Sequence, residues 1–95
     1  MNQTKLIKSL KLEKWFLGEI EKPDSMVNRF LSGFILNFIL KSLSDKKKKG
    51  FLELVADEKD KKILKFVQRN IPEFEKEMAK ELKSKLVNLK GNALA

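Results

Sequence analysis

The apolar residues near the end of the chain recur at intervals of three and four, and this periodicity constrains the fold most. The recurring positions are Phe74, Met78, Leu82, Leu86 and Leu89. Such spacing places apolar side chains on one face of an α-helix. Pro72 suits the first position of that helix, and Gly91 is a common terminator. The pattern therefore predicts a long amphipathic helix from Pro72 to about Lys90.

A second helix is predicted from about residue 25 to Leu43, and it contains the most apolar stretch of the chain, Phe30 to Leu40. Pro23 ends whatever precedes it, and Asp24 or Ser25 can cap the new helix. Apolar residues cover most of its circumference, which is typical of a helix at the centre of a domain. The stretch is far shorter than the ~20 residues that cross a bilayer, so no integral membrane span is expected.

The remaining segments also carry helix signals. Ser44 is placed to cap a helix over 45–56, and Asp57 to cap another over 58–69. The first segment, residues 4–20, has helical spacing with a break expected near Leu12. Gly33 either permits a close helix crossing or is simply tolerated. We therefore predict an all-α single domain over residues 1–91, with four or five helices in an orthogonal array, and a disordered tail over 92–95.

The composition bears on several kinds of chemistry. The 95 residues include no Cys, no His and no Tyr, so disulfides and the commonest metal ligands are missing. The acidic residues lie mainly at predicted helix starts or on polar helix faces, where they do not form a catalytic pair. We expect no enzymatic activity, no cofactor, no metal and no small-molecule substrate. The N-terminus does not read as a signal peptide, and a cytoplasmic location is expected.

Positive charge is the clearest sign of a partner. The chain has 21 Lys and Arg against 13 Asp and Glu, a net charge of +8. The sharpest cluster is Lys46-Lys47-Lys48-Lys49, which could contact phosphates or an acidic partner. Only two of the basic residues are Arg, the residue preferred for reading bases. The charge therefore indicates either sequence-independent binding of an anion or a merely solvated lysine-rich surface.

Trp15 and Phe16 form a second candidate site. Trp15 lies beside Lys14 and near Glu19, so it could be an exposed anchor for a partner protein. The alternative is that both aromatic residues belong to the core. If the first segment does not pack on the other helices, its apolar face needs another chain to cover it, which favours self-association or a complex.

Residues 43–89 resemble small helical domains of uncharacterised proteins from uncultivated, reduced-genome bacteria. The resemblance is carried by Leu43-Ser44, Phe51-Leu52-Glu53-Leu54, Asp57-Glu58, Phe66 and Asn70-Ile71-Pro72-Glu73-Phe74. These residues are helix caps and core positions, so the resemblance implies a helical fold. It implies no activity, cofactor or partner.

Three hypotheses for function follow. The first is a non-catalytic helical binding module that contacts another protein or a second copy of itself. The alternative is non-specific binding to nucleic acid or to the ribosome through lysine-rich surface. A third is peripheral attachment to a membrane through Phe30 to Leu40, which requires that helix to be exposed.

Overall fold

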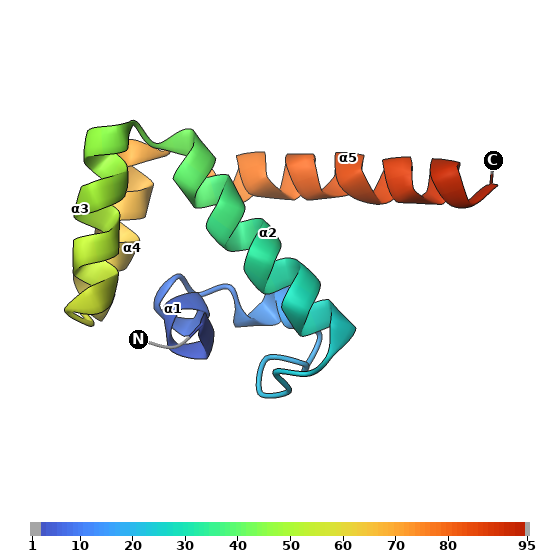
Figure 1. Cartoon of the computed structure of the whole chain (residues 1–95), viewed down its shortest axis with the longest axis horizontal. Helices are drawn as coiled ribbons and strands as arrows, with labels where there is room; N and C mark the ends of the chain where they lie inside the picture. The colour runs from blue at the N-terminus through green and yellow to red at the C-terminus, as the bar shows by residue number, and fades with distance from the viewer. Residues whose placement is uncertain (1–2, 95) are drawn as a thin grey trace.

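The computed structural model describes the backbone of residues 3–94 and the side chains of residues 3–86. The chain folds into α1 (Gln3–Ser9), the short 3-10 helix η1 (Glu13–Phe16), α2 (Met26–Ser42), α3 (Asp45–Ala56), α4 (Asp60–Asn70) and α5 (Phe74–Leu94). The described residues contain no strand, and the all-α prediction is confirmed. The helices run in several directions instead of sharing one axis (Figure 1).

The core is built around α2, as its apolar circumference predicts. Leu31, Ile35 and Ile39 of α2 are buried, and so are residues from every other helix. These partners are Leu6 and Ile7 of α1, Phe16 of η1, Phe51 of α3, Ile63 and Val67 of α4, and Phe74 and Met78 of α5. Because apolar area removed from water stabilises a fold by about 25 cal/mol per Å², this shared cluster is what holds the short helices together.

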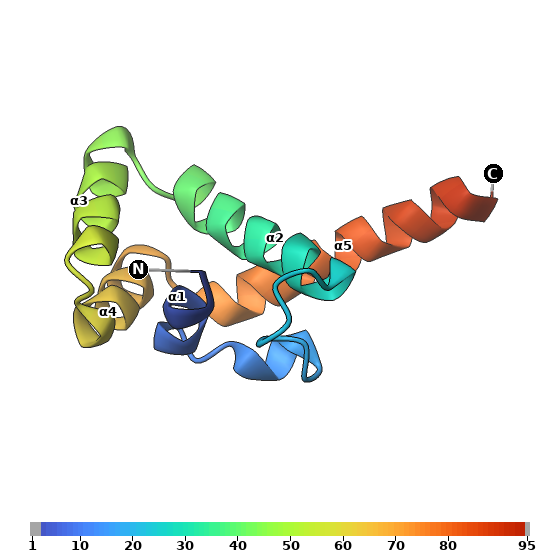
Figure 2. The same cartoon turned by 60° about the horizontal axis from the view of Figure 1, so that its bottom comes forward.

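Two helix arrangements position the surfaces described below. Helices α3 and α4 lie side by side as a hairpin, with the Phe51 and Phe66 ring centroids 6.2 Å apart, and α1 packs against α4 (Figures 1 and 2). Helix α5 starts beside α2, and its C-terminal half projects beyond the other helices (Figure 1). The molecule is consequently elongated, with extents of 44 × 28 × 19 Å.

Several predicted helix ends are confirmed. The Ser25 hydroxyl accepts a hydrogen bond from the Asn28 N–H at 3.4 Å, and the Ser44 hydroxyl accepts one from the Lys47 N–H at 3.4 Å. Ser25, of the two candidates, is therefore the cap of α2. The first segment breaks near Leu12, between α1 and η1.

Other predicted helix ends are wrong. Asp57 ends α3 instead of capping α4, because Glu58 turns into the left-handed region (φ 54°) and α4 begins at Asp60. Similarly, α5 begins at Phe74 and not at Pro72, because Glu73 has φ 55°. Gly91 does not end α5, which continues to Leu94. Of the predicted tail, Ala95 lies outside the described residues.

The structure also decides between the two interpretations of Gly33. A Cβ atom added at Gly33 would meet nothing within 4 Å, so no helix crosses closely at this position. At Gly50 of α3 an added Cβ would lie 3.6 Å from the Phe66 ring, an ordinary van der Waals contact. Neither glycine is therefore required for two helices to pack.

Candidate functional site

The charged residues are distributed unequally between two regions of the molecule. Residues 3–11 and 45–70, which contain α1, α3 and α4, carry twelve basic and five acidic side chains, a net charge of +7. We call them the basic region. The rest of the chain, residues 12–44 and 71–95, carries nine basic and eight acidic side chains, a net charge of +1. We call it the neutral region. Almost all of the chain's excess charge therefore lies on three helices that pack together.

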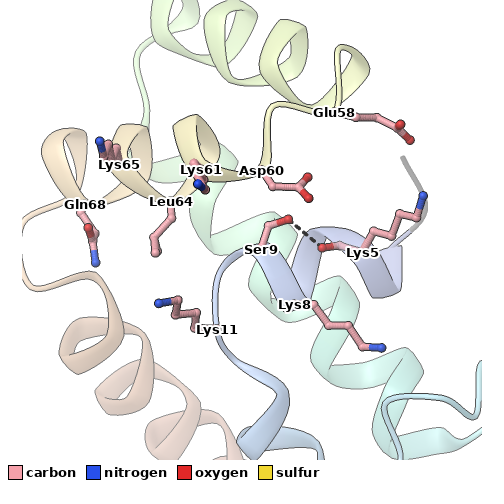
Figure 3. A pocket seen from close by; sticks show the side chains of 10 residues that line it. All are labelled: Lys5, Lys8, Ser9, Lys11, Glu58, Asp60, Lys61, Leu64, Lys65 and Gln68. Carbon is pink, nitrogen blue, oxygen red and sulfur yellow. Dashed lines mark hydrogen bonds between the residues drawn. The ribbon is translucent and has the colours of Figure 1, made fainter.

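A groove of about 740 Å³ lies beside the contact between α1 and α4, within the basic region (Figure 3). Leu64 supplies apolar surface in it, and most of the other residues around it are polar or charged. The lining residues are Lys5, Lys8, Ser9, Lys11, Glu58, Asp60, Lys61, Leu64, Lys65 and Gln68. Five lysines against two carboxylates make this groove electropositive.

Three of these lysines lack a counter-charge. Within the described part of the chain, Lys11, Lys61 and Lys65 have no acidic partner at ion-pair distance, whereas Lys8 pairs with Glu21. Lys61 and Lys65 are four residues apart on α4, a spacing at which like charges repel by a few tenths of a kcal/mol. A bound anion would relieve that repulsion.

The two carboxylates of the groove lie toward one end of it. Figure 3 shows Glu58 and Asp60 at the start of α4, on the side where Lys5 lies. At the other end, the Lys11 side chain extends from the end of α1 toward Leu64 and Gln68 of α4. Within the lining of the groove the carboxylates thus lie away from Lys11, while Glu73 and Glu75 line a neighbouring hollow that shares Leu64 and Gln68.

Lys11 has a backbone conformation that usually selects glycine. Its φ is 58°, in the left-handed region, where a Cβ atom crowds the following carbonyl. Two hydrogen bonds close the end of α1 around it, from the Lys11 N–H to the Lys8 carbonyl (3.0 Å) and from the Leu12 N–H to the Ile7 carbonyl (3.2 Å). This is the Schellman termination, in which the left-handed residue is most often Gly. The chain thus has a lysine at a position where glycine would be more stable.

The tetra-lysine run lies in the first two turns of α3. Lys46, Lys47 and Lys49 are exposed, and Lys48 is half-buried and pairs with Asp45 at 3.6 Å. These lysines belong to the basic region but do not line the groove. Sequence reasoning favoured the run because its residues are contiguous. The lysines of the groove were missed because their positions, spread from 5 to 65, come together only through the packing of α1 on α4.

Trp15 and Phe16 have different environments. Phe16 is completely buried, so the prediction that it anchors a partner at the surface is wrong. Trp15 is half-buried, and its Nε1–H donates a hydrogen bond to Glu75 Oε1 at 3.2 Å. Lys14 Nζ lies 3.0 Å from the same oxygen, and these two hydrogen bonds hold the pKa of Glu75 below its usual value. The pair of aromatic residues therefore connects η1 to the core and to α5.

The neutral region exposes large apolar side chains on two helices, Met26 and Phe30 of α2 and Leu86 of α5. Met26 is 86% exposed, Phe30 41% and Leu86 46%. Phe30 is the open end of a row of rings that continues into the core through Phe34, with 6.3 Å between their centroids. Lys85 Nζ lies 5.2 Å from the Phe34 centroid and connects α5 to the row. We refer to Met26, Phe30 and Leu86 as the apolar surface.

Leu86 is exposed because of the direction of α5. Phe74 and Met78 are buried and Leu82 is half-buried, so the predicted stripe is confirmed over its first three positions. The stripe then extends beyond the core as α5 projects past the other helices (Figure 1). Leu89 lies outside the described side chains. Sequence periodicity identifies an apolar face, but it does not say how much of that face has a partner within the chain.

A buried polar joint fixes the loop before α2. The Asn28 side-chain amide donates hydrogen bonds to the carbonyls of Glu19 (2.9 Å) and Ile20 (3.0 Å), and its oxygen accepts one from the Ser32 hydroxyl (3.1 Å). Both side chains are buried, so these bonds replace water contacts that burial removes. The joint holds the loop of residues 17–25 against the start of α2, beside the apolar surface.

The described residues contain no group of three carboxylates that could hold a metal ion. Across residues 3–94, no helix has both the length and the apolar character that crossing a membrane requires. The chain matches no protein-family model, no curated protein and no solved structure.

Proposed function

We propose that the protein is a non-catalytic helical binding module whose apolar surface binds another protein. The observation that carries this proposal is the exposure of Leu86, because it continues a stripe whose earlier members, Phe74 and Met78, are buried. A partner that covers this half-exposed leucine would stabilise the complex by about 25 cal/mol for each Å² of apolar area removed from water.

The same surface has the composition of a protein contact. Aromatic residues and Met are enriched in protein interfaces, and Phe30 and Met26 are of these types. Lys85 and Arg29 supply charges at its edge, where polar groups surround an apolar centre. The membrane hypothesis has less support, since Leu31, Ile35 and Ile39 of the same apolar stretch are buried in the core.

Site-specific photo-crosslinking tests the proposal. A photoreactive amino acid is placed at Phe30 or at Leu86 in the full-length protein, and adducts formed in cells are compared with those from the same group at Leu52. Leu52 is the matched control because it is 52% exposed but lies on α3, in the basic region. We expect a discrete adduct from positions 30 and 86 and none from 52.

The size of the adduct identifies the kind of partner. A band at twice the mass of the chain means self-association, which sedimentation of the purified protein then checks. A band of another mass means a different protein. Equal labelling from all three positions, or no adduct together with a strictly monomeric protein, would contradict the proposal.

A second candidate function, sequence-independent binding of a nucleic-acid backbone, is favoured by the charge distribution. The net charge of +7 on α1, α3 and α4 is a suitable electrostatic footprint for a phosphate chain. Lysine predominates there, which fits contacts with phosphates more than the reading of bases. Fluorescence anisotropy with labelled DNA and RNA tests this candidate, and absence of binding at low salt would reject it.

A further inference from the structure

We infer that the groove between α1 and α4 is a binding site for the phosphate backbone of double-stranded nucleic acid, centred on Lys11, Lys61 and Lys65. This inference rests on the second candidate function and gives it a location. It differs from the sequence prediction, which placed the contact on the lysines at 46–49.

The first support is the combination of shape and charge. Lysines line the groove on both of its sides, Lys11 from the turn that ends α1 and Lys61 and Lys65 from α4. A phosphate chain lying along it would meet lysines from both sides. A run at the start of one helix lacks this property, because four successive lysines point in different directions around the helix axis.

The second support is that Lys11, Lys61 and Lys65 form no ion pair with the described residues, whereas Lys8 of the same groove pairs with Glu21. Like charges brought together without partners cost a little stability. That cost is recovered when an anion binds between them.

The third support is the backbone of Lys11. A residue in the left-handed region at the end of a helix is most often glycine, and keeping a larger side chain there costs stability. Leu17, Glu58 and Glu73 have the same conformation at other turns, but strain of this kind is also found at functional sites, where the side chain has a use that offsets its cost. Here the side chain that is kept extends across the groove toward α4 (Figure 3).

The lining of the groove favours a duplex over a single strand. Proteins that bind single strands without sequence preference stack the bases on aromatic side chains. The lining includes no Phe or Trp, and the chain has no Tyr. Contact is therefore limited to the backbone, and a duplex offers the denser line of phosphates, one charge for every ~1.7 Å of its axis.

The test compares the intact protein with three sets of Lys→Gln variants by fluorescence anisotropy, using a short labelled DNA duplex at about 50 and 200 mM salt. The groove variant changes Lys11, Lys61 and Lys65. The control variant changes Lys76, Lys80 and Lys83 on α5, which removes the same charge from the neutral region. A third variant changes Lys46 to Lys49. All these lysines are outside the buried core, and circular dichroism verifies that each variant is folded.

We expect the groove variant to lose at least ~10-fold in affinity at the lower salt, with a log–log salt slope shallower by about 2 to 3, because each lost phosphate contact removes about 0.9 from the slope. The control variant should lose much less. Equal losses of affinity in the two variants would overturn the assignment of the binding site to the groove, since net charge alone would then explain binding.

The other outcomes separate this inference from the function on which it rests. If the Lys46 to Lys49 variant loses affinity and the groove variant does not, the groove is overturned while nucleic-acid binding stands. Tighter binding of a labelled single strand than of the duplex overturns the choice of duplex. If the intact protein binds neither, the inference and the second candidate function fail together.

Discussion

The basic region and the neutral region differ in how nearly their charges balance, with net charges of +7 and +1. In the neutral region, ion pairs join Lys14 to Glu75 and Lys41 to Glu81, so charges of η1 and α2 are neutralised by α5. In the basic region, Lys11, Lys61 and Lys65 have no such partners among the described residues. The net charge of +8 is thus a property of one part of the surface, and a composition value averaged over the chain conceals it.

The two regions also differ in how far their large apolar side chains are buried. Phe51 and Phe66 of the basic region pack on each other, and Phe51 is completely buried. The neutral region leaves Met26, Phe30 and Leu86 partly or largely exposed, whereas in the basic region Leu52 is the large apolar side chain with comparable exposure among the described residues. A single small domain therefore offers two chemically different surfaces, one suited to anions and one suited to an apolar partner. The following variants test whether the two are independent.

The largest expected effect is the loss of unfolding free energy on removing a buried aromatic ring, compared with removing a partly exposed one. Phe51→Ala should lower the free energy of unfolding by about 3–5 kcal/mol, because it leaves a cavity between α3 and α4. Phe30→Ala should cost about 1 kcal/mol or less, since the ring is 41% exposed and loses mainly its contact with Phe34. Urea unfolding of both variants measures the difference. Similar losses would mean that Phe30 belongs to the core and not to a binding surface.

The next effect concerns the polar joint beneath the apolar surface. Asn28→Ala should cost about 1–3 kcal/mol, because the Glu19 carbonyl and the Ser32 hydroxyl lose their hydrogen bonds to Asn28, and the Ile20 carbonyl keeps only the long one from the Thr4 hydroxyl. Asn37→Ala, at an exposed position of the same helix, is the matched control and should be neutral or slightly stabilising. Thermal melts of the two variants provide the comparison. Equal melting temperatures would indicate that the joint adds nothing to stability.

Most of the fold was predictable because its signals are local. A Ser side chain bonds to an N–H three residues later, which is why Ser44 was predicted as a cap and Ser25 as one of two candidates. The errors fall at Asp57 and Pro72, where Glu58 and Glu73 adopt the left-handed region and delay the next helix. A glutamate there gives no sign of a turn, because glycine is the residue that usually marks one.

The candidate sites were less predictable because they depend on how segments far apart in the sequence pack together. The groove depends on the packing of α1 on α4, and Lys11 is 50 positions away from Lys61 in the sequence. The exposure of Leu86 depends on the direction of α5, which no periodicity encodes. Phe16 was proposed as a surface anchor because the sequence around Trp15 does not distinguish a buried aromatic residue from an exposed one. The structure buries Phe16 completely.

A third variant separates stability from binding in the basic region. Lys11→Gly should raise the free energy of unfolding by about 1 kcal/mol, because glycine adopts φ 58° without a steric cost. The same change should weaken binding of the DNA duplex. Leu17→Gly is the control, since Leu17 has φ 51° and a largely exposed side chain in the neutral region. It should also gain stability, but duplex binding should stay unchanged.

The outcome of this pair decides whether Lys11 has a use. If both glycine variants gain stability and only Lys11→Gly loses affinity, the lysine is kept for its side chain at the expense of stability, as expected of a binding residue. If Lys11→Gly binds the duplex as well as the intact protein does, its left-handed conformation is only a feature of the turn, and the groove loses one of its supports.

The smallest effect tests the ion pair that connects η1 to α5. The pKa of Glu75 is lowered by hydrogen bonds from Lys14 and then Trp15, so the folded state favours the ionised carboxylate more than the unfolded state does. Its contribution is fully present above the unfolded-state pKa of about 4.3 and is lost as pH falls through the lower folded-state value. Glu75→Gln should remove this part of the acid dependence, worth less than about 1 kcal/mol because the pair is largely exposed.

Glu77→Gln is the matched control for this measurement, because Glu77 lies on the same helix and makes no ion pair with the described residues. Urea unfolding at several pH values between about 3 and 7 compares the two variants, a range that spans the ordinary carboxylate pKa. A shallower acid dependence for Glu75→Gln alone would show that the neutral region uses its charges to fix α5 in place. Identical curves would mean that the core contacts of Phe74 and Met78 are sufficient to orient α5, and with it Leu86.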